Sequence, residues 1–460
     1  MDRSEFLKIL GLTASGTALG GFSNVAKAMD KFDTTTILDD DTNREAKVSK
    51  PVTVILVGAG SRGTTYTDYA LHFPKSMTVV GVSDINEERK KIAADKHKIP
   101  VKYQFGDWSE VFKVPKFADA VVISTPDNLH YEPCMKALEM GYQVLLEKPA
   151  AQSAQQCYDI LNQAKKYNSI VGVCHVLRYA PYFLALKKTL DSGIIGDILS
   201  IQHFEPILFH HMAHSYVRGN WHNSKETTPI ILAKSCHDLD LIRWMTNKKC
   251  EQVSAFGNLT LFKEENAPKG SAERCLDCSV ERECAFSAKK IYLKEGRYKY
   301  VFDFPADKSK HESFILDKLR TTNYGKCVFR CNNDQCDHYV MSMKFEGGLT
   351  ASFSMEGLTS YSGRRTRIMG TKGDIVGDMK KFTATDFLTG KETVWNEDIS
   401  KLHGYSGHAG GDWGIVKDFL LAVDNKNPDY LSSNIDVSIE SHVMGFKAEE
   451  SRLLGQTVKI

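Results

Sequence analysis

Apolar runs alternate with amphipathic stretches through residues 51–150. The runs are almost continuously apolar, which is typical of strands that are covered on both faces of a parallel sheet. Strands are expected at residues 52–57, 77–84, 120–124 and 143–146. Helices are expected at residues 64–73, 85–97 and 132–140. Strand, helix and strand in repeated order predict a doubly wound parallel sheet of the Rossmann type.

The later part of the chain shows a different pattern, in which apolar and polar positions alternate. Residues 338–357 alternate around a Gly-Gly turn, and residues 365–378 continue the alternation. These hairpins predict an open, mostly antiparallel sheet packed by helices, and a closing helix is expected at about 438–454. The expected fold class is therefore α/β plus α+β, with a Rossmann domain at 51–175 and a second domain at 176–460.

The N-terminus has the features of an export signal. Residues 9–22 are weakly apolar, and the A-x-A triplet at 26–28 resembles a cleavage site. The string RSEFLK resembles a twin-arginine signal, except that Ser4 replaces the second arginine. Residues 1–28 would then send the protein to the periplasm, whereas an amphipathic helix at this place would leave it cytoplasmic. The polar residues 29–50 are interpreted as a linker.

Charge and hydropathy narrow the range of partners. The chain has 59 basic and 57 acidic residues, a net charge of +2, and no basic block, so no nucleic-acid partner is expected. The N-terminal apolar segment is too short and too rich in Gly, Ser and Thr to span a bilayer. A small-molecule ligand fits this composition better.

A glycine-rich loop follows the first expected strand. In GAGSRG, Gly58 would make the tight turn, Gly60 would let a pyrophosphate approach the backbone, and Gly63 would allow close helix packing. Asp84 ends the second strand, where a carboxylate would bind the adenosine ribose and repel a 2′-phosphate. This arrangement predicts NAD rather than NADP. A helix N-cap role for Asp84 is the alternative, and Arg62 and Arg89 could still favour NADP.

Two further motifs complete the pattern: STPDNLH at 124–130 and LEKP at 146–149. In this order the motifs resemble the Gfo/Idh/MocA family of sugar and polyol oxidoreductases, over about residues 51–460. The resemblance implies that Lys148 lies between the nicotinamide and the substrate hydroxyl; the sheet itself places Lys148 at the carboxyl end of a strand, and Pro149 fixes the turn. The implied cofactor-binding residues are Gly58, Gly60, Ser61, Arg62, Gly63, Asp84, Thr125, Pro126, Asn128, His130, Glu147 and Lys148.

The resembled family also has an acid/base histidine in a D-x-x-x-H-x-x-D pattern. His237 and Asp240 match its last two positions, but Ala233 stands where the first aspartate is expected. Histidine alone can accept a hydroxyl proton because its ordinary pKa is about 6.5. Asp238 or Lys234 could orient it instead. A structural histidine capping the helix is the alternative.

Substrate contacts are expected from two stretches, CHVLRYAP at 174–181 and HHMAHSYVRGNWH at 210–222. The expected substrate residues are His175, Arg178, Tyr179, Arg218, Asn220, Trp221, Lys234 and Asp240. The histidines at 210, 211 and 214 have helical metal spacing, but a strand ending in a loop fits the same letters better. The Gly-rich stretch 403–413 is interpreted as a substrate loop.

Six of the 11 cysteines lie between residues 275 and 336, and five of them are inside an expected insertion at 262–335. Cys275, Cys278 and Cys284 could bind structural zinc, with a fourth ligand from Cys327, Cys331, Cys336 or His338. Disulfides, if the protein is exported, and unligated thiols are the alternatives. In each case the cysteines are expected to brace a loop rather than to do chemistry.

The sequence therefore predicts an NAD(P)-dependent oxidoreductase. A hydride would move between the bound nicotinamide and a ring carbon of a sugar, glycoside or polyol, with Lys148 polarising the oxygen and His237 as acid/base. Two alternatives stay open: an NAD-dependent glycosidase that works by transient oxidation and elimination, and a non-catalytic NAD-sensing protein. The resemblance further implies a homo-oligomer, a dimer or a tetramer.

Overall fold

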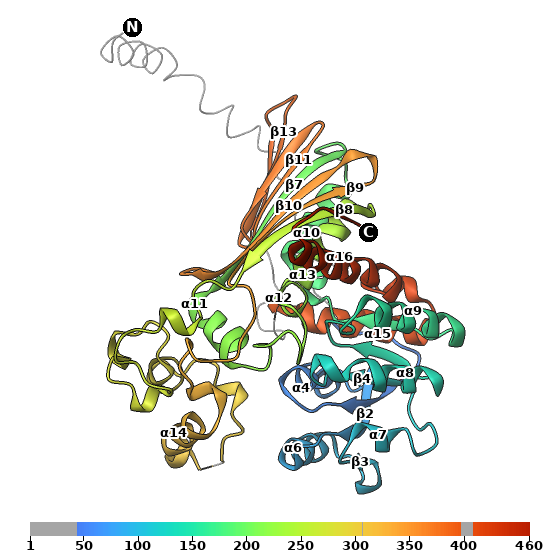
Figure 1. The fold of residues 1–460 in the computed structure, drawn as a ribbon. Coiled ribbons are helices and arrows are strands. Elements are labelled where there is room, and N and C mark those ends of the chain that lie inside the picture. Colours follow the sequence, from blue (N-terminus) through green and yellow to red (C-terminus); the bar gives the residue numbers. More distant parts are fainter. Residues whose placement is uncertain (1–43, 306, 397–407) are drawn as a thin grey trace, which may run out of the picture.

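The computed structural model describes residues 44–305, 307–396 and 408–460 of the chain. Two sheet-containing domains lie one above the other in Figure 1, and a smaller body around α14 (His311–Thr321) lies beside them. The expected export signal at 1–28, most of the expected linker and part of the 403–413 stretch lie outside the described residues. None of the described helices combines the length and the apolar character needed to cross a bilayer.

The first domain contains a six-stranded parallel sheet in the order β3-β2-β1-β4-β5-β6. Its strands are β1 (Val52–Val57), β2 (Met77–Ser83), β3 (Gln104–Phe105), β4 (Ala120–Ile123), β5 (Gln143–Leu146) and β6 (Val171–Val173). The helices are α4 (Ser61–Thr67), α5 (Tyr69–His72), α6 (Glu87–His97), α7 (Trp108–Val111), α8 (Tyr131–Glu139) and α9 (Ala154–Tyr167). Separate apolar cores cover the two faces of the sheet, which explains the continuous apolar runs and confirms the doubly wound prediction.

Residues 44–50, which belong to the expected linker, pack on the first domain. Arg44 and Ala46 are buried, and the Ala46 backbone N–H donates to the Tyr69 hydroxyl at 2.8 Å. The Ser76 hydroxyl donates to the Ala46 carbonyl at 2.7 Å. Short polar contacts therefore hold this part of the expected linker on the domain.

The second domain contains a nine-stranded sheet in the order β14-β13-β12-β11-β7-β10-β9-β8-β15. Only the central β7–β10 pair is parallel; the other pairs are antiparallel, as predicted. The strands are β7 (Ile198–Leu208), β8 (Cys250–Asn258), β9 (His338–Phe345), β10 (Thr350–Thr359), β11 (Arg365–Gly370), β12 (Gly373–Gly377), β13 (Lys381–Asp386), β14 (Glu392–Asn396) and β15 (Val458–Lys459). The helices are α10 (Pro181–Asp191), α11 (Phe209–Met212), α12 (Ile230–Ala233), α13 (Cys236–Thr246) and α16 (Ile435–Leu454). Helix α15 (Gly411–Asn425), from the same part of the sequence, packs on the core of the first domain.

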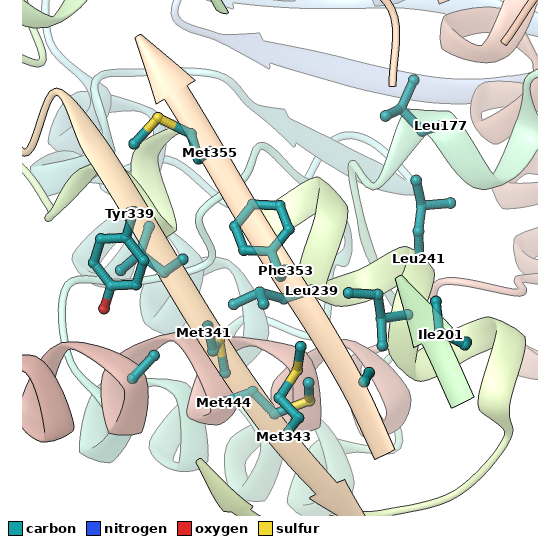
Figure 2. Close-up of a cluster of buried hydrophobic side chains, with 14 of the residues drawn as sticks. Leu177, Ile201, Leu239, Leu241, Tyr339, Met341, Met343, Phe353, Met355 and Met444 are labelled. Atoms are coloured by element: carbon teal, nitrogen blue, oxygen red, sulfur yellow. The ribbon is translucent and has the colours of Figure 1, made fainter. Parts of the chain in front are cut away.

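Alternation along the strands places one set of side chains in the domain core. Figure 2 shows Met341 and Met343 on β9 and Phe353 and Met355 on β10 in one apolar cluster that also includes Met444 of α16. The other positions of these strands face away from this core, as the period of two requires. Helix α16 also packs on α9 and β6 of the first domain, so it fixes the two domains against each other.

The expected insertion lies between β8 and β9, two strands that pair directly with each other. It has a small core of its own, which includes Ile291, Tyr292, Phe302 and Leu319. In Figure 1 the insertion lies next to α11 and away from α8 and α9. The hairpin β8–β9 therefore carries a separately packed body instead of a short turn.

Candidate active site

The glycine-rich loop has the geometry that a dinucleotide pyrophosphate requires. Gly58 has a φ of +90°, and a Cβ there would lie 2.8 Å from the Ser124 backbone. At Gly60 the nearest atom to an added Cβ would be Arg89 Nη1 at 4.0 Å, so the space in front of that backbone is open. These residues fit NAD at the carboxyl end of β1.

Asp84 lies beside this loop. Its Oδ2 accepts from the Ala59 backbone N–H at 2.7 Å, and its Oδ1 accepts from the Asn86 N–H at 2.7 Å. The N-cap of α6 is Asn86, whose side chain accepts from the N–H groups of Glu88 and Arg89. The N-cap alternative for Asp84 was therefore wrong, and the carboxylate is placed next to the phosphate-binding backbone.

Both arginines that could have favoured NADP have carboxylate partners. Arg62 Nε lies 2.8 Å from Glu147 Oε1, and its Nη2 lies 2.6 Å from Asp412 Oδ1. Arg89 Nε lies 3.0 Å from Oδ1 of Asp303, a residue of the insertion. The insertion thus reaches the nucleotide-binding edge of the first domain, where its Asp303 pairs with Arg89.

The loop after β4 is held by His130. This buried imidazole faces the Pro149 carbonyl at 2.7 Å through Nδ1 and the Thr125 carbonyl at 2.8 Å through Nε2. His130 therefore joins the loops after β4 and β5. Ser61, Pro126 and Asn128 are exposed at the same edge of the sheet.

Lys148 follows β5 and reaches across to the second domain. Its ammonium donates to the Ala233 carbonyl at 2.9 Å, and the Lys148–Pro149 peptide is cis. Glu147 is buried and accepts from Tyr66 at 2.6 Å and from Arg62. Burial raises the pKa of Glu147, but Arg62 and Lys148 outweigh it and keep that pKa below its ordinary value. The ionised Glu147 side chain, bonded to Tyr66 and Arg62, therefore anchors the backbone directly before Lys148.

His237 lies in the first turn of α13, close to the Lys148 ammonium. Burial, followed by the positive charge of Lys148, lowers the pKa of His237 well below its ordinary value. The imidazole is therefore neutral at neutral pH and able to accept a proton. Its Nδ1 has no hydrogen-bond partner among the described residues. The structure thus brings the two expected catalytic side chains together.

Neither residue expected to orient His237 does so. Asp238 is buried and accepts from His203 Nε2 at 2.9 Å and from Arg364 Nε at 2.6 Å. Lys234 Nζ lies 3.1 Å from Glu205 Oε1. Consecutive positions on a helix point in different directions, so Asp238 cannot follow its neighbour into the site. That expectation was wrong.

Further histidines surround His237. The ring centroids of His175 and His408 lie 6.1 Å and 6.2 Å from that of His237. Burial lowers the pKa of His175 to about 3, so it too is neutral. His408 Nδ1 lies 3.0 Å from Asp412 Oδ1. The described end of the 403–413 stretch therefore borders the site.

Three residues expected to contact substrate instead hold the scaffold. Arg178 donates to Asp240 through Nε at 2.7 Å and Nη2 at 2.6 Å, and both side chains are 1% exposed. The buried Tyr179 hydroxyl lies 3.0 Å from Ser433 Oγ. Because these groups are already bonded inside the protein, they do not face a ligand: Arg178 holds α13 through Asp240, and Tyr179 holds the segment at Ser433.

The three histidines of the 210–222 stretch lie in α11 and in the π-helical segment at Ala213–Arg218 that follows it, so a helix stands where a loop was expected after the strand. His210 and His214 face the Tyr298 and Tyr292 hydroxyls at 2.6 Å and 2.8 Å. Arg218 points into the insertion, Asn220 is exposed and Trp221 packs against the domain core. In the described residues, no three His, Cys, Asp or Glu side chains form a site for one metal ion, so zinc is not supported.

Sequence reasoning missed the charged residues that surround His237 from the sheet. Glu205 lies on β7 and Arg364 precedes β11, and these two pair at 3.0 Å. His211 belongs with them, since Lys234 and Lys148 are among the charges that lower its pKa. No local motif marks these residues; only the nine-stranded sheet brings them together.

A parallel sheet with a dinucleotide loop, facing a second domain that supplies a histidine opposite a lysine, defines a class: two-domain, nucleotide-dependent oxidoreductases. The chain belongs to the Gfo/Idh/MocA oxidoreductase family. The model of the oxidoreductase family's NAD-binding Rossmann fold matches residues 52–175, and the model of its C-terminal alpha/beta domain matches residues 187–450.

Individual relatives are distant. Putative oxidoreductase YteT of Bacillus subtilis is 24% identical over 364 residues, which cover 74% of this chain and 82% of the relative. An inositol 2-dehydrogenase/D-chiro-inositol 3-dehydrogenase of Lactiplantibacillus plantarum is 26% identical over 46% of this chain and 56% of its own length. The solved inositol dehydrogenase homolog of Azotobacter vinelandii, complexed with NADH and myo-inositol, shares the fold with a TM-score of 0.64 at 15% identity, covering 91% and 100% of the two chains.

Proposed function

We propose that this protein is an NAD-dependent dehydrogenase that oxidises a ring CH–OH group of a sugar or polyol. The observation that carries the proposal is the meeting of Lys148 and His237 at the carboxyl edge of the parallel sheet. An ammonium and a neutral imidazole in one place suit removal of a hydroxyl proton. A relative is an inositol dehydrogenase, and a solved homolog binds NADH and myo-inositol; both support a polyol as the substrate class.

The residues that would hold NAD are the loop at Gly58–Gly63 and Asp84. When bound, NAD supplies the acceptor for the hydride that leaves the substrate carbon. The carboxylate of Asp84 favours a free ribose hydroxyl over a 2′-phosphate. Because Arg62 and Arg89 are each paired with carboxylates, neither is a ready partner for that phosphate. These contacts support NAD over NADP.

Lys148 and His237 divide the work on the substrate oxygen. The Lys148 ammonium has three N–H donors, of which the structure commits one to Ala233. A second can hydrogen-bond the substrate hydroxyl and stabilise the negative charge that develops on its oxygen. His237 accepts the hydroxyl proton, and the low pKa produced by burial and by Lys148 keeps it in the basic form beforehand.

The test compares Lys148→Met and His237→Asn with Lys113→Met and His72→Asn, two exposed positions of the first domain. Purified protein is given NAD and a panel of inositols, sugars and glycosides, and reduced nicotinamide is followed by absorbance. The two site variants should lower kcat by about 10²–10⁴-fold, while the exposed variants should not.

Three outcomes would contradict the proposal. Unchanged turnover in both site variants would remove the assigned roles. Sugar release without accumulation of reduced nicotinamide would favour a glycosidase that oxidises its substrate transiently. NAD binding without turnover of any panel member, in wild type and variants alike, would favour a sensing protein.

A further inference from the structure

A cavity inside the insertion is lined by four cysteine side chains. Cys275, Cys278, Cys284 and Cys327 border it together with Arg218, and no residue of the nucleotide loop or of the Lys148–His237 pair takes part. All 11 cysteines of the chain lie in its described part and carry free thiols. The two parts of the cysteine pattern, far apart in sequence, therefore meet around one space.

Arg218 is the strongest sign that this space holds negative charge. Its side chain is 1% exposed, and it donates to the Lys326 carbonyl at 2.8 Å and the Phe286 carbonyl at 2.9 Å. Its Nη2 also lies 3.4 Å from Cys275 Sγ, while Nη1 is buried and has no partner among the described residues. No carboxylate pairs with this cation in the described residues. A buried guanidinium without an anion is costly, so Arg218 leaves this cavity suited to a negatively charged occupant.

Other N–H groups also point at the sulfurs. The Ala288 backbone N–H donates to Cys275 Sγ at 3.5 Å, and Arg330 Nη1 donates to Cys327 Sγ at 3.7 Å. Such donors stabilise thiolates rather than thiols, and N–H groups directed at sulfur are among the features that tune iron–sulfur sites. Two of the sulfurs that border the cavity therefore already receive N–H donors.

The arrangement does not suit a single ion. A zinc site needs its sulfurs about 2.3 Å from one point, and among the described residues no three ligands converge in that way. Four cysteines around a shared cavity instead match a cubane cluster, in which each thiolate binds a different iron. Cys331 and Cys336 do not line the cavity, and Cys331 donates to the Cys327 carbonyl at 3.3 Å. Cys327 is therefore the fourth ligand.

We propose that Cys275, Cys278, Cys284 and Cys327 bind a four-iron, four-sulfide cluster as thiolates, with Arg218 compensating part of its negative charge. Assembly takes ferrous and ferric iron in equal amounts, together with sulfide, from outside the protein and releases one proton from each thiol, so the cluster forms in the oxidised state that dithionite can reduce. The cluster braces the insertion, and no electron transfer is assigned to it. The role is independent of the proposed dehydrogenase reaction.

The experiment measures metal on the full-length protein, produced and purified without oxygen and, in a parallel sample, reconstituted with equal amounts of ferrous and ferric iron and with sulfide. We expect about 4 iron and 4 acid-labile sulfide per chain, with broad visible absorption that dithionite bleaches. Cys275→Ser and Cys284→Ser should lose most of this iron. Cys250→Ser, which changes a buried cysteine of β8 outside the cavity, should keep it.

Several results would overturn the proposal, and the wild-type measurements do not depend on whether a variant folds. Stoichiometric zinc without sulfide would show a mononuclear site. Disulfides in the anaerobic protein, or free thiols with no iron after reconstitution, would show that no cluster forms. As a further variant, Arg218→Gln should retain less cluster than wild type if the guanidinium supplies counter-charge; equal iron content would contradict its assigned role.

Discussion

Asp240 offers the sharpest test of which residues build the site and which face the substrate. Its carboxylate is fully inside the protein and receives two hydrogen bonds from Arg178, at 2.7 Å and 2.6 Å. Arg178 is equally buried, and its Nη1 donates to the neutral Ser432 carbonyl. Replacing Asp240 by Asn keeps the size of the side chain but leaves the guanidinium without its negative partner.

The loss should be large. Each hydrogen bond to a charged group contributes about 1.5–3 kcal/mol, so two contribute about 3–6 kcal/mol. Breaking one side of a buried ion pair costs about 3–5 kcal/mol, which agrees. We expect Asp240→Asn to lower the free energy of unfolding by about 4 kcal/mol. At about 2–4 °C per kcal/mol for domains of this size, Tm should fall by about 8–16 °C.

The assays are thermal and urea unfolding, with kcat and KM measured well below Tm. Asp436→Asn is the matched control. The Asp436 side chain is 57% exposed, and its 2.7 Å ion pair with Lys165 contributes at most about 1 kcal/mol to the free energy of unfolding. The double variant Arg178→Met with Asp240→Leu should recover at least half of the lost stability, since it removes both charges. A large rise in KM with unchanged Tm would refute the reasoning and return Asp240 to the substrate contacts.

Three further predictions concern the cofactor and pH. Asp84→Ser should weaken NAD binding and lower the ratio of the Kd for NADP to the Kd for NAD at least tenfold. An unchanged ratio would argue against the contact between Asp84 and the ribose. Asp303→Ala should speed NAD release in stopped-flow displacement, because it removes the insertion's hold on Arg89, while an unchanged rate would show that this contact does not retain NAD. The pKa of His175 falls from 6.5 to about 3 in the folded protein, so the unfolded state binds more protons in between and stability is lost as pH falls below about 6.5. At about pH 5 this histidine alone should cost about 2 kcal/mol of unfolding free energy, and His175→Gln should flatten the acid side of a Tm–pH curve; an equal slope would contradict the assignment.

The repeating elements of the fold could be predicted because their signals are local. The run at Val52–Val57 is buried on both faces in the parallel sheet, and the alternation of β9 and β10 places Met341 and Phe353 in one core. The central parallel pairing of β7 with β10 could not be predicted, since the two strands are separated by about 150 residues with no periodic link. Strand periodicity reports which face is buried but not which strand lies next to it.

In the candidate site, too, residues with a local sequence signal could be predicted and residues brought together by the fold could not. Gly58, Asp84 and Lys148 were found because each follows a strand of the parallel sheet, whose carboxyl ends meet at one edge. Arg178 was assigned to substrate from the family resemblance and Arg218 because its residue type suits a sugar, yet both are buried and bonded inside the protein. Residue type alone does not distinguish a ligand contact from a buried ion pair, because both use the same hydrogen-bonding groups.

The insertion connects the nucleotide-binding edge of the first domain with the cysteine cavity. Tyr298 of the insertion contacts His210, and its Asp303 pairs with Arg89 at the nucleotide-binding edge. Its interior contains the cysteine cavity, which Arg218 also borders. A body with so small an apolar core gains little stability from burial alone. A cross-link among its cysteines would supply the rigidity that the Asp303 contact needs in order to hold a dinucleotide in place. The cysteines and the cofactor would then be coupled through structure, without any part of the cluster touching the reacting atoms.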